Sequence, residues 1–138
     1  MEEKSFSDIS YQQFLNEEKL MGSKCEKCGA LYAPPRPICI QCYGMEMQWI
    51  ELKGKGKLVA FTCIAVGTPF MIQEGYDRKH PYVSGVIELE EGARVDARIE
   101  EVDGNQPETI KIGTPLVVKF LHRGEGENRR TYLAFKPL

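Results

Sequence analysis

The sequence predicts a mainly β protein with an N-terminal helical segment, a small metal-binding ribbon and a five-stranded β-barrel. Three observations predict this class. Two C-x-x-C pairs lie close together, one short stretch before them has helical spacing, and five later segments are rich in β-forming residues. We expect the helical segment at residues 1–22, the ribbon at 23–52 and the barrel domain at 53–138.

The two pairs supply four soft sulfur ligands, enough to complete a tetrahedron around one Zn²⁺ ion. They are Cys25, Cys28, Cys39 and Cys42. Two intervening residues let both thiolates of a pair reach the same ion, and the short connection between the pairs is typical of rubredoxin-like ribbons. Two disulfides, four free thiols or bound iron in an electron carrier are the alternatives. A filled tetrahedron leaves no position for water or substrate, so the zinc is predicted to be structural.

The turn after each pair favours glycine. Gly29 follows the first pair directly and Gly44 closely follows the second. Each of these glycines can adopt the positive φ that such a turn often needs.

Composition excludes several classes of protein. The net charge of −2 and the pI of 5.8 argue against a general nucleic-acid binder. No apolar run is long enough for a membrane span, and the acidic N-terminus does not resemble a secretory signal. Cysteines paired for metal fit a reducing compartment, so we expect a cytoplasmic protein. The remaining cysteine, Cys63, is expected to be a buried inert thiol.

The helical lead-in is expected over residues 5–19. Ser10 followed by Gln13 fits a capping box, while Tyr11, Phe14 and Leu15 follow helical spacing. So narrow an apolar stripe must dock on this chain's own core or on a partner.

Five segments read as strands. They are 58–66, 82–89, 93–100, 115–121 and 131–136. In the third, Val95, Ala97 and Ile99 alternate with charged residues and are expected to face inward. Gly85 is expected to mark a bulge or sharp coil. Five mainly antiparallel strands predict a closed OB-fold barrel, with an open sandwich as the alternative.

Catalytic motifs are missing from the sequence. It contains no G-x-S-x-G, and His80 and His122 are more typical of surface or packed residues. We therefore expect a binding subunit and not an enzyme. The competing hypothesis is a single-stranded nucleic-acid binder that stacks bases on Phe61, Tyr82 or Tyr132, although the acidic balance makes nucleic acid an unlikely partner.

The order of motifs resembles one family. C-x-x-C-G at 25–29 is followed by P-P-R-P-x-C-x-x-C at 34–42, Trp49, G-K-G at 54–56, P-Y-V at 81–83 and I-G-x-P-x-x-V at 112–118. This order is similar to that of the acyl-CoA-associated zinc-ribbon/OB-fold proteins, once catalogued as a domain of unknown function. The resemblance spans essentially the whole chain. It implies an accessory role beside thiolase-like or other acyl-CoA enzymes, with coenzyme A or an acyl-CoA as ligand.

Two stretches offer cations for the phosphates of coenzyme A. The basic turn at 53–57 lacks a P-loop pattern and reads as a hairpin or linker turn. The loop at 67–80 is the better candidate, because Phe70 offers apolar surface and Arg78 and Lys79 offer charge. The alternative is that Phe70 only caps the barrel while both cations stay solvated.

Overall fold

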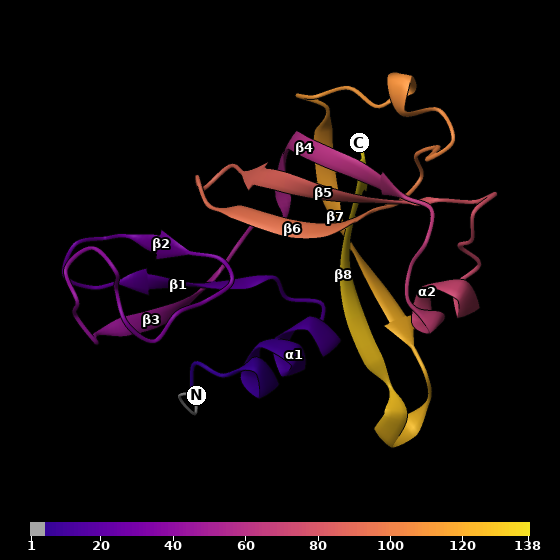
Figure 1. Cartoon of the computed structure of the whole chain (residues 1–138). Helices are drawn as coiled ribbons and strands as arrows, with labels where there is room; N and C mark the ends of the chain where they lie inside the picture. The colour runs from indigo at the N-terminus through magenta and orange to yellow at the C-terminus, as the bar shows by residue number, and fades with distance from the viewer. Residues whose placement is uncertain (1–4) are drawn as a thin grey trace. The chain divides into compact units, whose positions relative to one another are not determined.

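The structure, a computed structural model, describes residues 5–138 and contains a helix, a three-stranded sheet and a closed five-stranded barrel (Figure 1). The chain divides into two compact units. One holds the described residues up to Gly54 together with Glu90–Ala93 and Phe120–Tyr132, and the other holds Lys55–Leu89, Arg94–Lys119 and Leu133–Leu138. Within residues 5–138, no helix is both long and apolar enough to span a bilayer.

Helix α1 spans Asp8–Asn16. Its N-cap is Ser7, whose hydroxyl accepts a hydrogen bond from the Ser10 N–H. The prediction that Ser10 begins the helix is therefore wrong, because Ser10 lies inside the helix and is buried. Ser7 supplies the same chemistry one turn earlier, since both residues are serines with short hydroxyl side chains.

Helix α1 docks on its own chain. Phe14 packs against the Trp49 ring at 4.8 Å between centroids. On another side, the Gln12 amide donates to the Thr131 carbonyl at 2.7 Å, and the Thr131 N–H donates to Asn16 Oδ1 at 3.0 Å. Aromatic packing and partly buried hydrogen bonds thus hold helix α1 in place. A short helix with so narrow an apolar stripe would not be stable alone.

The ribbon is an antiparallel sheet of three short strands in the order β2–β1–β3. Strand β1 spans Met21–Cys25, β2 spans Leu31–Tyr32 and β3 spans Met47–Glu51. Ser23, in the middle of β1, is fully buried, and its hydroxyl bonds to both the N–H and the carbonyl of Arg36. This side chain therefore ties the proline-rich connection to the sheet.

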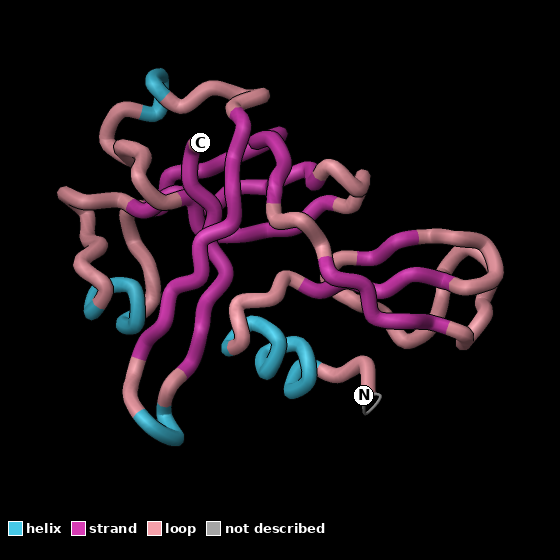
Figure 2. Tube along the Cα trace, turned by 180° about the vertical axis from the view of Figure 1, so that it is seen from behind, coloured by secondary structure: helices cyan, strands magenta, loops and turns pink. Residues whose placement is uncertain are grey.

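The barrel closes in the order β4–β5–β6–β8–β7, and its strands can be followed in the trace of Figure 2. Its strands are β4 (Lys55–Ile64), β5 (Tyr82–Leu89), β6 (Arg94–Ile99), β7 (Pro115–Arg123) and β8 (Arg130–Pro137). Strand β4 pairs antiparallel with β5 and with β7, β5 pairs antiparallel with β6, and β6 pairs parallel with β8. This is the five-strand OB-fold, which confirms the prediction of a closed barrel.

Short helices occupy the barrel connections. Helix α2 (Pro69–Gln73) lies between β4 and β5, and two 3₁₀ turns lie at Pro107–Thr109 and Gly126–Asn128. The basic segment that looked like a flexible turn is mostly strand, since Lys55, Gly56 and Lys57 pair with β7. Pairing with β7 therefore outweighs the preference of the glycines in this segment for turns and loops.

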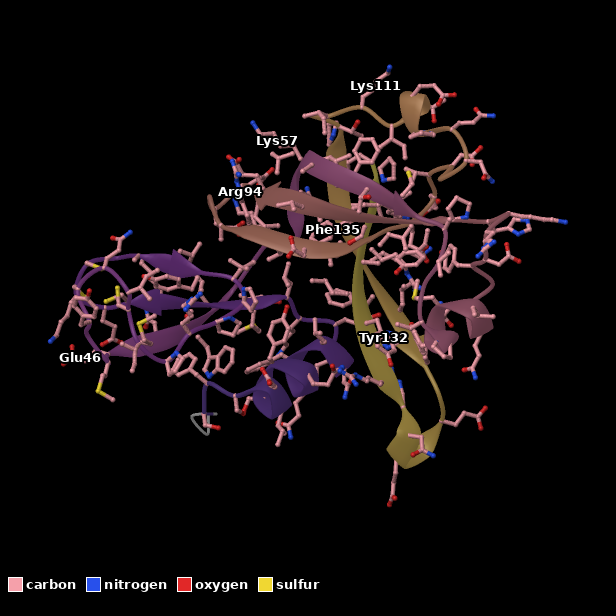
Figure 3. All side chains as sticks on the ribbon, viewed as in Figure 1. Glu46, Lys57, Arg94, Lys111, Tyr132 and Phe135 are labelled. Atoms are coloured by element: carbon pink, nitrogen blue, oxygen red, sulfur yellow. The ribbon has the colours of Figure 1, made fainter. Side chains whose placement is uncertain are left out.

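The barrel interior is filled by large aliphatic and aromatic side chains. Phe135, labelled in Figure 3, is completely buried on β8. Val95, Ala97 and Ile99 face inward as predicted. Gly85 sits in regular pairing with Phe61 and Ala97, whereas the register shift falls in β4 between Leu58 and Ala60, so the predicted bulge at Gly85 is wrong.

Close packing explains Gly85. A Cβ atom at this position would lie 2.9 Å from a methyl of Leu58 and 3.0 Å from Ile99. We therefore expect Gly85→Ala to overpack the interior and lower the free energy of unfolding by about 1–3 kcal/mol. Urea denaturation measures this change. Ser84→Ala, half-buried on the same strand, is the matched control and should stay within about 0.5 kcal/mol of wild type. Equal stability of the two variants would contradict the packing argument.

Candidate functional site

Four sulfur atoms converge at one end of the ribbon. The Sγ atoms of Cys25, Cys28, Cys39 and Cys42 all lie within 4.8 Å of one another. The separations Cys25–Cys42 and Cys28–Cys39 are both 3.5 Å, too long for a disulfide, and none of the cysteines is disulfide-bonded. Four ligands about 2.3 Å from a central Zn²⁺ would lie about 3.8 Å apart, so this donor set fits one tetrahedral zinc ion.

The two knuckles repeat the same backbone geometry. In the first, the Cys25 N–H donates to the Ala30 carbonyl and the Gly29 N–H donates to the Cys25 carbonyl. In the second, Cys39 bonds to Gly44 and Tyr43 bonds to Cys39 in the same way. All four of these hydrogen bonds are 2.9 Å long. The two knuckles are therefore related by a local pseudo-symmetry.

That pseudo-symmetry corrects one prediction. The residue after each second cysteine has a positive φ, which is +79° at Gly29 and +59° at Tyr43. Gly44 does not have a positive φ. A Cβ at Gly44 would lie 3.3 Å from Cys42 Sγ and 3.2 Å from the Lys27 side chain, so there is little space for a side chain at this position. The positive φ of the turn is therefore adopted by Tyr43, a bulky residue for which this backbone conformation is strained.

Hydrogen bonds to sulfur polarise the four thiols. The N–H of Cys28 lowers the pKa of Cys25, and the Tyr32 hydroxyl followed by the N–H of Cys42 lowers the pKa of Cys39 to about 6. The N–H of Ala30 acts to lower the pKa of Cys28, but contact with Cys39 and loss of hydration raise it to about 12.

Cys42 follows the same pattern, because contact with Cys25 and loss of hydration outweigh the N–H of Gly44 and raise its pKa. Each close pair therefore combines one sulfur whose pKa is lowered with one whose pKa is raised. A zinc ion would displace the protons that remain on the four sulfurs.

The two histidines lie outside the sulfur cluster. His122 Nδ1 is 2.6 Å from the Thr131 hydroxyl and its Nε2 is 2.9 Å from a Glu18 carboxylate oxygen. The exposed His80 ring lies 3.0 Å from Asp77 Oδ1. Within residues 5–138, the four cysteines are the one group of His, Cys, Asp or Glu side chains placed to share an ion. Each histidine is therefore engaged with neighbouring polar groups, away from the metal centre.

The loop at 67–80 is held on the barrel by a half-buried polar cluster. Arg98 of β6 forms an ion pair with Glu74 at 3.2 Å and lies 3.9 Å from Glu100. The Tyr76 hydroxyl donates to Glu100 at 2.7 Å, and burial followed by this bond raises the pKa of Tyr76 to about 12. The Arg98 guanidinium also lies over the Tyr76 ring. These contacts preorganise the loop that follows β4.

The structure places the three predicted ligand residues in two local structures. Phe70 is about one-third exposed on α2. Arg78 and Lys79 are exposed in a turn that Asp77 closes, since its Oδ1 accepts hydrogen bonds from the N–H groups of Lys79 and His80. Their role in ligand binding stays a prediction.

Tyr82 and Tyr132, two of the residues proposed to stack bases, have other partners. Tyr82 forms an edge-type contact with Tyr76 at 5.6 Å between ring centroids, and the Arg130 guanidinium carbon lies 5.2 Å from the centroid of the Tyr132 ring. The carboxylates of Glu74 and Glu100 lie close to Tyr76. A strand-binding groove requires cationic surroundings, so this region of the barrel does not favour the nucleic-acid alternative.

Two family models match the chain. The model described as the ChsH2 rubredoxin-like zinc ribbon domain matches residues 13–47, and the model described as the ChsH2 C-terminal OB-fold domain matches residues 49–121. The chain belongs to the ChsH2 zinc-ribbon/OB-fold family. The predicted resemblance, fold class and zinc ribbon are thereby confirmed.

Individual ChsH2-type relatives give more detail. The chain is 34% identical over 119 residues to a "DUF35 domain-containing scaffold protein" from Methanothermobacter thermautotrophicus, covering 85% of this chain and 84% of that one. It is 35% identical over 86 residues to "Benzoylsuccinyl-CoA thiolase subunit BbsA" from Thauera aromatica, covering 62% and 55%. A solved structure titled "Ltp2-ChsH2(DUF35) aldolase" shares the fold, with a TM-score of 0.76 at 23% identity over 99% of this chain and 98% of that one.

Metal binding and folding are expected to be coupled in the ribbon. We predict that Cys25→Ser or Cys39→Ser releases zinc and unfolds residues 23–52, because each serine removes a buried thiolate ligand. Elemental analysis measures the zinc, and near-ultraviolet circular dichroism of Trp49 reports the ribbon. Cys63→Ser, outside the cluster, is the control and should keep both signals. A ligand variant that retains its zinc and its melting curve would refute the coupling.

Proposed function

We propose that this chain is a non-catalytic cytoplasmic subunit that holds a thiolase-like acyl-CoA enzyme and contributes to binding its coenzyme A thioester. The four cysteines act as structural zinc ligands in this proposal. The observation that carries it is an exposed apolar surface on the second zinc knuckle. The names of the relatives, a scaffold protein and a thiolase subunit, support the same kind of partner.

The apolar side chains of the second knuckle are unusually exposed. Tyr43 is 80% exposed, Met45 75%, Ile40 58% and Ile38 45%. These four exposed apolar residues lie within eight positions of the sequence and are here called the knuckle patch. Exposed apolar clusters on soluble proteins mark protein–protein contacts more often than isolated apolar residues do.

The first knuckle shows that the metal does not require this patch. It makes the same backbone hydrogen bonds, yet Glu26 stands where the second knuckle has Ile40, and Gly29 stands where it has Tyr43. The backbone geometry is therefore satisfied by a polar sequence. The apolar side chains of the second knuckle serve something other than metal binding.

Tyr43 strengthens this argument. A bulky residue at φ +59° costs about 1 kcal/mol relative to glycine. The pseudo-symmetric position holds Gly29 without such a cost. A tyrosine that is strained and also exposed is consistent with selection for binding, and tyrosine is enriched at protein interfaces.

The charges near the knuckle patch indicate what kind of surface the partner presents. Glu26 and Glu46 are exposed and joined by a backbone hydrogen bond, and Figure 3 shows Glu46 at the sulfur-containing end of the ribbon. Lys27 partly offsets these carboxylates. A filled four-thiolate zinc site adds two further negative charges. The complementary surface on the partner subunit is therefore an apolar pocket with a cationic rim.

The chemistry of the described residues supports a non-catalytic role. A four-cysteine site leaves the metal no position for substrate. The two histidines are engaged with Thr131, Glu18 and Asp77. The contribution to ligand binding is assigned to Phe70, Arg78 and Lys79, on a loop that Arg98 anchors to the barrel.

The knuckle patch can be tested by co-purification of the full chain from its native cells. We predict that Ile40→Ser combined with Tyr43→Gly abolishes recovery of the thiolase-like subunit, because both apolar contacts are lost. Tyr43→Gly should leave zinc content unchanged and keep or raise the melting temperature, because it relieves the positive φ.

The matched control is Glu26→Ser at the pseudo-symmetric position of the first knuckle, which should retain the partner. Equal recovery with all variants would remove the knuckle patch from the interface. Failure of the wild-type chain to recover any acyl-CoA enzyme would refute the scaffold function itself.

The ligand loop generates a separate prediction. Reversing both charges, Arg78→Glu with Lys79→Glu, should weaken coenzyme A binding at least tenfold, because attraction to phosphate becomes repulsion. Isothermal titration calorimetry of the assembled complex measures the affinity at two salt concentrations. The control, Lys24→Glu with Lys27→Glu in the ribbon, should bind normally. Unchanged affinity in the loop variant would leave Arg78 and Lys79 solvated, as the alternative interpretation holds.

A further inference from the structure

Tyr32 contacts the metal centre although it belongs to the ribbon sheet. Its hydroxyl oxygen lies 3.3 Å from Cys39 Sγ and accepts a hydrogen bond from the Ile40 N–H at 3.1 Å. Tyr32 lies on β2, where it pairs with Ser23 of β1. Sheet pairing, and not the knuckle turn, therefore positions the hydroxyl beside the sulfur.

The direction of the hydrogen bond follows from the chemistry of both groups. The Ile40 N–H occupies the acceptor side of the hydroxyl oxygen, which leaves its proton free to point elsewhere. A thiolate bound to a metal ion carries no proton and can only accept. The Tyr32 hydroxyl therefore donates to Cys39 Sγ when the site is filled.

Comparison of the two knuckles shows that the Tyr32 contact is not part of their shared backbone geometry. Cys25 receives backbone N–H groups from Lys27 and Cys28, and Cys39 receives those of Gln41 and Cys42. Cys39 also has a contact with the Tyr32 hydroxyl. Within residues 5–138, Cys25 has sulfur and backbone N–H neighbours but no corresponding hydroxyl contact. The backbone turn does not require it. The contact is an additional restraint on one buried ligand.

We propose that Tyr32 is a positioning residue of the metal centre, whose hydroxyl holds the Cys39 thiolate and the second knuckle in the binding geometry and slows loss of the metal ion. Hydrogen bonds from outer residues to metal ligands typically change metal affinity by about 10–100-fold. This role does not depend on a partner enzyme or on coenzyme A, so it stands or falls separately from the proposed scaffold function.

Tyr32→Phe in the full chain removes the hydroxyl and keeps the ring, which lies 5.9 Å from the Arg36 guanidinium carbon. We expect zinc transfer to a competing chelator to become about 10–100-fold faster. In the cobalt-substituted protein, the sulfur-to-metal charge-transfer band should move to lower energy, because a thiolate that loses a hydrogen bond is a stronger electron donor. Tyr43→Phe, an exposed tyrosine of the same ribbon, is the control and should change neither signal.

Two results would overturn the proposal. One is a Tyr32→Phe protein whose rate of zinc transfer and cobalt spectrum match those of wild type, even if its melting temperature falls. The hydroxyl would then contribute to packing only.

If Tyr32→Phe does not fold, 3-fluorotyrosine at position 32 keeps the contact with a more acidic hydroxyl. That protein should release zinc more slowly and absorb at higher energy, and the absence of both shifts is the second contradicting result.

Discussion

The convergence of four thiol groups is the constraint on which the ribbon depends. Its strands are only two to five residues long, too short to enclose a core of ordinary size. Cys25 and Cys39 are completely buried, and a metal ion would replace the protons on the four converging sulfurs. Metal binding therefore supplies the cohesion that apolar burial supplies in the barrel, where Phe135 and Leu58 are fully enclosed.

A module held together by metal leaves most of its side chains free for other purposes. The two knuckles share their backbone hydrogen bonds, yet one is polar and the other carries the apolar Ile40 and Tyr43. The same separation of framework from function appears in the barrel. There Arg98, Glu74 and Glu100 fix a loop to the strands, which leaves the surface of that loop available for a ligand. A rigid framework that carries exposed binding surfaces suits a protein that acts by binding other molecules.

Local patterns predicted much of this architecture. The C-x-x-C spacing identified the four converging cysteines, and alternation identified the inward face of β6, because both signals depend on residues close together in sequence. The predictions failed where distant residues decide. Gly85 is small because Leu58 and Ile99 surround it. The positive φ falls on Tyr43 because the second knuckle repeats the turn of the first, in which Gly29 has the equivalent position. The packing around Gly85 is not contained in any local pattern, and the sequence-based prediction places the turn one residue too late.

The sequence by itself determined the class of the protein, the four cysteines that converge and the places of the barrel strands along the chain, because cysteine spacing and hydrophobic periodicity are local properties. Tertiary structure alone decided that Tyr32 meets Cys39, that α1 docks against Trp49 and Thr131, and that Arg98 anchors the loop before β5. These contacts join segments whose proximity arises only when the sheet pairs and the barrel closes. Their geometry is therefore a property of the folded chain.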